Sequence, residues 1–327
     1  MTDPATPLLS GWRYRAVIWS VILAAAGYLA FALWGGWTEV VHALVQVGLI
    51  GTAVSLVLSL VNYGMRFLRW QAYLRAMDHP VPWRPSLAIY LAGFALTTTP
   101  GKAGEALRGV LLKRWGVPYP QSLAAFLSER LSDLVAILLL TLFGLSIYPA
   151  ARPMMIAGGL AVLAAYIVVS NPRPVELLIE RMHGDGRFVK LLRHGLQVLL
   201  QARRCHTPSL LAGATALSLI GWAAEAWTFH LILQWMSIDV PLEFAVFVYA
   251  ISMLAGALTF MPGGLGSAEG VMVSLLIWKG APGADAIAAT VLIRLATLWF
   301  AVAIGCVTLA RLTGQSGHGE VASDIRR

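Results

Sequence analysis

The chain has 327 residues, of which 58% are hydrophobic and 12% charged, and its formal net charge is +8. The charged fraction is about half that of an ordinary soluble domain, which excludes a soluble globule, a disordered chain and a coiled coil. The apolar residues suffice for about six to eight membrane spans of about 20 residues each. The sequence therefore predicts an all-α integral membrane protein, whose positive charge fits basic cytoplasmic loops and need not indicate nucleic acid.

Six full spans are predicted in chain order. They cover residues 16–34, 44–62, 123–146, 154–170, 209–235 and 287–309. A cleaved signal peptide is the alternative for the first span, but its apolar stretch is long and no clear small-x-small cleavage site follows. Residues 171–208 mix leucine with arginine and lysine, which is typical of an amphipathic helix that lies on the inner leaflet.

Two further apolar stretches are short, and each runs into a Pro-Gly turn. Residues 85–99 resume after the turn as a second short helix at 104–115, and residues 244–261 resume at 267–278. This pattern predicts two re-entrant hairpins, which enter the membrane, break, and leave by the same face. Irregular backbone is tolerated at that depth where protein or a water-filled cavity surrounds it. The alternative is that each half is a distorted full span.

Basic loops set the expected orientation. The N-terminus, residues 63–85, residues 171–208 and the tail are basic, whereas loops 35–43 and 236–243 contain no Lys or Arg. We therefore expect both termini in the cytoplasm. The first hairpin then opens to the cytoplasm and the second to the opposite side.

The second half of the chain echoes the first. Residues 62–90 align with 221–249 at a constant offset of 159, which pairs Met77 with Met236, Pro82 with Pro241, Tyr90 with Tyr249 and Arg66 with Glu225. A second block, at an offset of 164, pairs Glu105 with Glu269, Gly116 with Gly280, Pro118 with Pro282 and Arg130 with Arg294. Coincidence within an apolar sequence is the alternative, but charged residues are too scarce to make two matching strings expected.

The two copies begin with spans of opposite direction, so the sequence predicts an inverted-topology repeat, an architecture of secondary transporters. The predicted organisation is a single membrane domain, residues 1–327, made of a first span (16–43), repeat one (44–146), a connecting span with the amphipathic helix (154–208), repeat two (209–309) and a cytoplasmic tail (310–327).

The hairpin tips are candidate binding elements. The first tip contains Pro100, Gly101, Lys102, Gly104 and Glu105, and the second contains Pro262, Gly263, Gly264, Gly266 and Glu269. Proline and glycine break the helix and leave backbone N–H groups without helical partners. The helix that follows directs its positive dipole end into the membrane. Together with Lys102 these groups favour an anion. The alternative role for each glutamate is to cap the start of its helix.

Charged residues in the spans are the other candidates, because a charge at the centre of a membrane helix costs about 2.5–3.5 kcal/mol. Arg130 shares a helix face with Asp133, as does Glu129, so the three form a buried ion-pair network or present Arg130 to a phosphate. Arg294 has no acidic neighbour on its helix, and its expected partner is Glu269 or the substrate.

Further charged side chains are assigned to entry and to coupling. Arg66, Arg69 and Arg108 are expected to form an entry ring at the cytoplasmic face, although anchoring to headgroups by snorkelling is the preferred interpretation for Arg69. Glu225 and His230 in the fifth span are candidate carriers of a coupling proton, and Glu225 is alternatively a fixed partner of a buried arginine.

The strings TPGKAGEALR, SERLSD and PGGLGSAEG, with an arginine in the last span, resemble the lysylphosphatidylglycerol synthase transmembrane region, also called the flippase-like domain family. The resemblance covers roughly residues 16–312. It implies lipid handling, since this region is associated with moving aminoacylated phosphatidylglycerol in multidomain bacterial members and is linked to polyprenyl-phosphate sugars in other relatives. By motif it implies Lys102, Glu105, Arg130, Glu269 and Arg294 as functional positions. The chain ends near residue 327, so we do not expect the soluble aminoacyl-transfer domain or synthesis of lysyl-lipid.

The function expected from the sequence is a flippase that moves an anionic, phosphate-bearing lipid between leaflets by alternating access. The alternatives are a transporter of small anions and an integral-membrane enzyme or accessory protein that acts on polyprenyl-phosphate. No nucleotide loop or metal cluster is visible, and Cys205 and Cys306 form no ligand set, so no cofactor is expected. The expected location is a bacterial or archaeal cytoplasmic membrane, and the expected partners are membrane lipids.

Overall fold

The structure is a computed structural model that describes residues 12–34, 36–99, 103–145, 152–182, 186–259 and 262–324. These residues form helices and turns, without a strand among them. The helices are α1 (Trp12–Trp34), α2 (Trp37–Ala76), α3 (Trp83–Gly93), η1 (Phe94–Leu96), α4 (Ala103–Lys113), α5 (Tyr119–Phe143), α6 (Arg152–Ser170), α7 (Pro172–Arg181), α8 (Arg187–Ala202), η4 (Arg203–Cys205), α9 (Pro208–Trp235), α10 (Leu242–Leu258), η5 (Pro262–Gly264), α11 (Ser267–Trp278), α12 (Gly283–Arg294), η6 (Leu295–Trp299) and α13 (Phe300–Asp324).

The described part of the chain contains helices that are long and apolar enough to cross a bilayer. They are Trp37–Ala76, Pro208–Trp235 and Gly283–Thr313, and the pair α6 and α7, bent by 66°, counts as a fourth if it is one span. Their outward faces carry large apolar side chains, such as Leu49 and Ile50 at 88% and 82% exposure. An apolar surface of this kind needs lipid around it, so the protein is a multi-pass membrane protein.

Helix α2 is longer than predicted. It covers 40 residues, with non-helical backbone at Gly48 (φ 67°, ψ −179°), and continues past Asn62 to Ala76, so the loop expected at 63–85 is wrong for residues 63–76. The helix continues because Phe67, Trp70 and Leu74 recur at helical spacing and are all buried.

The same kind of turn precedes α3 and α10. Asp78 and Ser237, which stand 159 positions apart, are the non-glycine residues of the described chain with positive φ, at 62° and 58°. The next amide bonds five residues back in both turns, from His79 to Leu74 at 3.0 Å and from Ile238 to Leu233 at 2.9 Å. Pro82 and Pro241 then occupy the position just before α3 and α10. The first block of the sequence alignment therefore shares its backbone geometry as well as its residues.

The second block shares a turn as well. Gly116 and Gly280 both have positive φ, 75° and 105°, which favours glycine because a side chain is strained there. Pro118 and Pro282 follow and occupy the position just before α5 and α12. The helix pair α3–η1–α4, here the first hairpin, and the pair α10–η5–α11, the second hairpin, thus stand in equivalent local settings.

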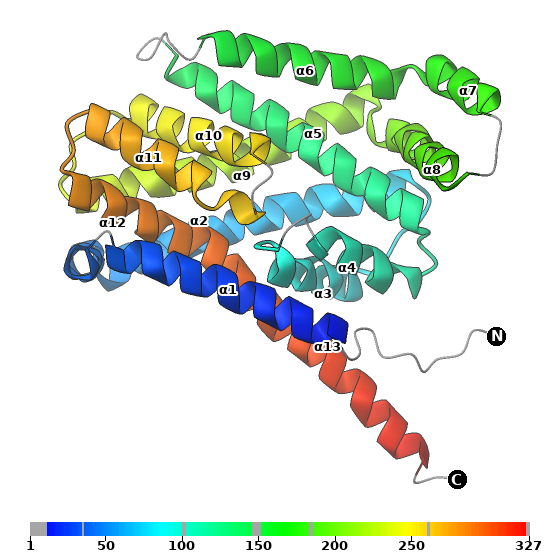
Figure 1. Cartoon of the computed structure of the whole chain (residues 1–327), viewed down its shortest axis with the longest axis horizontal. Helices are drawn as coiled ribbons and strands as arrows, with labels where there is room; N and C mark the ends of the chain where they lie inside the picture. Colours follow the sequence, from blue (N-terminus) through cyan, green and yellow to red (C-terminus); the bar gives the residue numbers. More distant parts are fainter. Residues whose placement is uncertain are drawn as a thin grey trace.

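The two hairpins lie toward opposite ends of the helix bundle (Figure 1). The first is at the end where α7, α8, the start of α1 and the end of α13 lie, and the second is at the other end. Each packs into its own core. Trp70, Tyr73, Tyr90 and Leu112 belong to the core around the first hairpin, and Phe229, Phe244, Phe247 and Ile293 belong to the core around the second.

The broken ends of the hairpins approach each other. A Cβ atom built on Gly263 of the second hairpin would lie 3.5 Å from Cγ2 of Thr98, which follows η1 in the first. Gly305 on α13 in turn approaches the backbone of Phe94 and Ala95 so closely that a Cβ atom would clash. The irregular segment of the first hairpin thus packs against α13, and that of the second lies beside Thr98 and Leu298.

Candidate functional site

Three arginine side chains converge on one carboxylate where α2, α5 and α9 meet. Asp133 on α5 lies 2.6 Å from Arg69, 3.2 Å from Arg130 and 3.6 Å from Arg66, measured from the nearest guanidinium nitrogen. Helix α9 completes the arrangement, because the Trp222 indole donates to Asp133 at 3.1 Å and the Ser218 hydroxyl accepts from Arg69. We call Arg66, Arg69, Arg130 and Asp133 the arginine cluster. It carries three positive charges and one negative charge.

The members of the arginine cluster differ in accessibility. The exposed fraction of the side chain is 0% for Arg69, 17% for Arg66 and 33% for Arg130. The Nε–H groups of all three are buried and meet no acceptor within the described residues. The cluster therefore has spare donors, and Arg130 is its most accessible member. The expectation that Arg69 snorkels to headgroups is wrong, because its guanidinium is held inside by Asp133.

A second pair ties the first hairpin to α5. Arg108 on α4 donates to Glu129 at 2.9 Å, and its guanidinium lies over the rings of Trp70 and Tyr90, 4.5 Å and 5.2 Å from their centroids. Glu129 therefore pairs with Arg108 and not with its helix neighbour Arg130. Opposite charges cancel within this pair, so it leaves the surplus of the arginine cluster unchanged.

The second hairpin is closed by Arg294. Its Nε donates to Glu269 at 2.6 Å and its Nη2 donates to the Gly263 carbonyl at 2.6 Å. The other carboxylate oxygen of Glu269 accepts from the Gly266 amide at 2.6 Å and so caps α11. Arg294 is thus the partner of Glu269, which was one of the two alternatives. Arg130, which the sequence alignment pairs with Arg294, contacts Asp133 but keeps one third of its side chain exposed.

The predicted first tip lies partly outside the described residues. Pro100, Gly101 and Lys102 lie outside the described residues, as does the side chain of Glu105, although the backbone of Gly104 and Glu105 lies in the first turn of α4. In the second tip Gly263, Gly264 and Gly266 have φ of 61°, 68° and 87°. The glycines are therefore required by the turn, and Pro262 begins it.

The two candidate proton carriers on α9 lie in different surroundings. Glu225 is buried and accepts a hydrogen bond from the Tyr249 hydroxyl at 2.5 Å. His230 is 9% exposed, and its ring Nδ1 meets no hydrogen-bonding partner in the described chain. Sequence reasoning found Glu225 but missed Tyr249 as its partner, although the alignment of Tyr90 with Tyr249 had marked that position.

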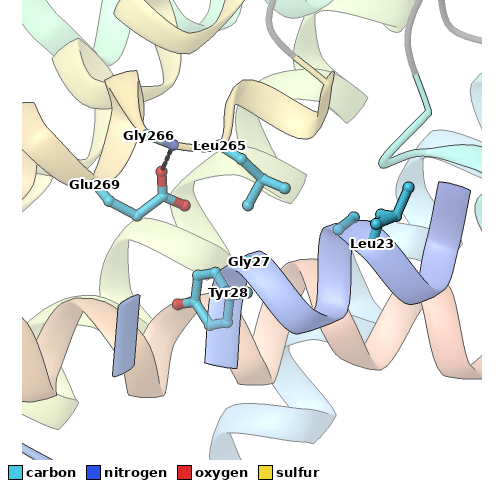
Figure 2. Close-up of a pocket in the computed structure, with 7 residues that line it drawn as sticks. Leu23, Gly27, Tyr28, Leu265, Gly266 and Glu269 are labelled. Carbon is cyan, nitrogen blue, oxygen red and sulfur yellow. Dashed lines mark hydrogen bonds between the residues drawn. The ribbon is translucent and has the colours of Figure 1, made fainter. Parts of the chain in front are cut away.

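A groove lies between α1 and the second hairpin (Figure 2). Its volume is about 280 Å³, and it is lined by Leu23, Ala24, Gly27, Tyr28, Leu265, Gly266 and Glu269. A Cβ atom on Gly27 would meet nothing within 4 Å, so the groove is open at this point. Figure 2 shows Leu265 directed toward α1, with the bonded Glu269 and Gly266 beside it. The sequence held only one signal of this groove, the run of small residues at 24–27.

These features define a polytopic membrane protein with charged side chains buried among its helices. Residues 17–305 match the family described as lysylphosphatidylglycerol synthase TM region, and since this is most of the chain, the protein belongs to that family. The chain is 23% identical over 310 residues to a UPF0104 membrane protein of Methanothermobacter thermautotrophicus, covering 88% of this chain and 91% of the relative. It is also 24% identical over 222 residues to a UPF0104 membrane protein of Methanocaldococcus jannaschii, covering 65% of this chain and 92% of the relative.

Proposed function

We propose that this protein is a flippase that moves an anionic, phosphate-bearing lipid between leaflets and performs no chemistry on it. The observation that carries the proposal is the charge of the arginine cluster, in which three guanidinium groups share one carboxylate. Each uncompensated charge in a membrane interior costs about 2.5–3.5 kcal/mol, so two surplus charges call for an anion. A phosphate ester supplies that charge and accepts the paired N–H groups of arginine.

The accessible Arg130 is the proposed first contact of the headgroup. Arg66 is the second, since its contact with Asp133 is the longest of the three and its side chain is partly exposed. Arg69 is the fixed member, which holds Asp133 in position. The arrangement lets a phosphate replace solvent at two guanidinium groups without breaking the buried pair.

The proposed architecture is six spans with two re-entrant hairpins, arranged as an inverted-topology repeat with both termini in the cytoplasm. The matching turns support the repeat, and the placement of the hairpins toward opposite ends of the bundle supports the inversion. Two inverted copies can exchange conformations, so that a site between them faces either leaflet. The present structure fits one such state, because Arg294 is locked to its hairpin while Arg130 is not.

A lipid is favoured over a small soluble anion by the groove between α1 and the second hairpin. Its lining is mostly apolar, and Glu269, the one charged residue of its described lining, is paired with Arg294. A lipid presents both kinds of surface, with hydrocarbon chains that stay in the bilayer and a charged headgroup. The proposed location is accordingly the cytoplasmic membrane of a bacterium or archaeon, where such lipids are part of the bilayer.

The proposal is tested with the protein in vesicles of phosphatidylcholine that contain fluorescent phosphatidylglycerol or a short-chain prenyl phosphate. We expect the protein to move one of these probes across the bilayer, and Arg130→Ala to abolish the movement. The matched control is Arg204→Ala, which also removes an arginine paired with an aspartate, in this case an exposed pair with Asp78 at 2.8 Å. Release of entrapped phosphate without lipid movement would indicate small-anion transport, and chemical conversion of a probe would indicate an enzyme.

A further inference from the structure

Glu225 differs from every other buried acid in the described chain. The buried carboxylates are Glu129, Asp133, Glu225 and Glu269. Three of them lie within 2.6–3.6 Å of an arginine nitrogen. Among the described residues, Glu225 alone of the four has no cationic nitrogen within ion-pair distance, and its hydrogen bond comes from the neutral hydroxyl of Tyr249.

The surroundings of Glu225 contain charges that act on it from farther away. The titratable and charged groups that face it are Tyr63 and Arg66 on α2, Asp133 on α5, Tyr249 on α10 and Arg294 on α12. Two of them are arginines that already contact other carboxylates, Arg66 with Asp133 and Arg294 with Glu269. Glu225 therefore sits between the arginine cluster and the closed second hairpin without a cation of its own.

A carboxylate in this position is costly as an anion, because nothing at contact distance compensates its charge in the membrane interior. A neutral carboxylic acid avoids that cost, and it still accepts the Tyr249 hydrogen bond through one oxygen. The geometry thus favours a Glu225 that holds a proton while the arginine cluster keeps its surplus of two charges. Loss of that proton would lower the combined charge of cluster and Glu225 from two to one.

We propose that Glu225 is a proton-binding site that couples transport to the proton gradient. The inference rests on the proposed movement of an anionic headgroup. A proton from water on one side binds the Glu225 carboxylate, strengthens binding of the anion at the arginine cluster, and leaves to water on the other side with the lipid. By linkage each ligand favours the other equally, so proton and anion move in the same direction.

The structure also offers the element that responds to the proton. Arg66 makes the longest of the three contacts with Asp133, at 3.6 Å, and its Nε meets no acceptor in the described residues. A deprotonated Glu225 would attract Arg66 across the α2–α9 interface and away from the headgroup. Arg66 and Glu225 are the positions that the 159-residue alignment pairs, so the two repeats place opposite charges at one register position.

The test uses the full-length protein in vesicles of phosphatidylcholine and phosphatidylglycerol, with a fluorescent phosphatidylglycerol probe and an entrapped pH dye. We expect a pH gradient to drive the probe toward the alkaline side. Glu225→Gln, which imitates the neutral acid, should still equilibrate the probe but lose the response to the gradient. Glu243→Gln, an exposed glutamate at the start of α10, is the matched control and should keep the response.

Two results would overturn the inference. One is probe movement by the unaltered protein that ignores the gradient, which leaves the flippase proposal intact, and the other is a Glu225→Gln variant with the full gradient response. Absence of probe movement under any condition would instead overturn the flippase proposal, and this inference with it. If Glu225→Gln does not fold, the Tyr249→Phe variant tests the inference instead, because it keeps the carboxyl group of Glu225 and removes its hydrogen bond. The pH of half-maximal movement should then shift, and an unchanged value would refute the role of Glu225.

Discussion

Substitution of two arginines that contact the same carboxylate should affect different properties of the protein. Arg69 and Arg130 both lie against Asp133, at 2.6 Å and 3.2 Å. The side chain of Arg69 is fully buried and also donates to Ser218, whereas that of Arg130 is one third exposed. We predict that Arg69→Ala mainly lowers stability and that Arg130→Ala mainly lowers transport.

The magnitudes follow from burial. Removing one partner of a buried ion pair costs about 3–5 kcal/mol. Arg69→Ala should lie near the lower end of that range, because Asp133 loses its shortest and fully buried contact but keeps the more distant Arg66 and Arg130. For Arg69→Ala this corresponds to an unfolding equilibrium shifted by about a hundredfold or more. A partly exposed pair contributes about 0–1 kcal/mol, and Asp133 keeps Arg69 as a partner after Arg130→Ala. The stability of the Arg130→Ala variant should therefore stay close to that of the unaltered protein.

The assay compares chemical unfolding in detergent, followed by tryptophan fluorescence, with lipid movement in vesicles. Arg69→Ala should unfold at clearly lower denaturant concentration, and Arg130→Ala should unfold normally but move no lipid. Equal losses of stability in the two variants would refute the distinction by burial. A stable Arg130→Ala variant that transports normally would refute the assignment of Arg130 to the headgroup.

Three further substitutions test other parts of the structure. Arg294→Ala should cost about 3–5 kcal/mol, because it removes the partner of a buried carboxylate, and unfolding in detergent measures this; an unchanged midpoint would contradict the closed second hairpin. Gly27→Leu should fill the groove beside α1 and slow lipid movement, whereas Gly159→Leu, at an equally open glycine on α6, should not; equal rates in both would argue against the groove. Gly305→Val should cost about 1–3 kcal/mol by overpacking against the first hairpin, again read from unfolding, and a neutral result would show that α13 can shift.

The sequence predicted the helical boundaries well where proline and glycine mark them. The expected helix at 267–278 is α11, Ser267–Trp278, and the expected span at 209–235 is α9, which starts one residue earlier. Proline suits the first turn of a helix and glycine suits its end, so these residues carry position as well as composition. The same markers led to the proposed repeat, and the turns of its two aligned blocks recur in the backbone geometry.

Pairings between distant helices could not be predicted. Arg69 and Asp133 are 64 positions apart, and only packing of α2 against α5 brings them together. Periodicity within α2 therefore left Arg69 as an apparent surface residue and ended the span too early. The partner of Glu225 was hidden for the same reason, because Tyr249 belongs to another helix. The correct pairing of Arg294 with Glu269 was among the alternatives only because the repeat had already singled out both.

The most direct test of the central claim is an experimental structure of the protein in nanodiscs that contain phosphatidylglycerol or a prenyl phosphate. Our account predicts phosphate density in contact with Arg130 and Arg66, beside an intact pair of Arg69 and Asp133. The account would be contradicted by a structure in which ordered lipid surrounds the protein but no headgroup contacts the arginine cluster. In that structure Arg130 would contact a protein carboxylate, and the cluster would be closed to both leaflets.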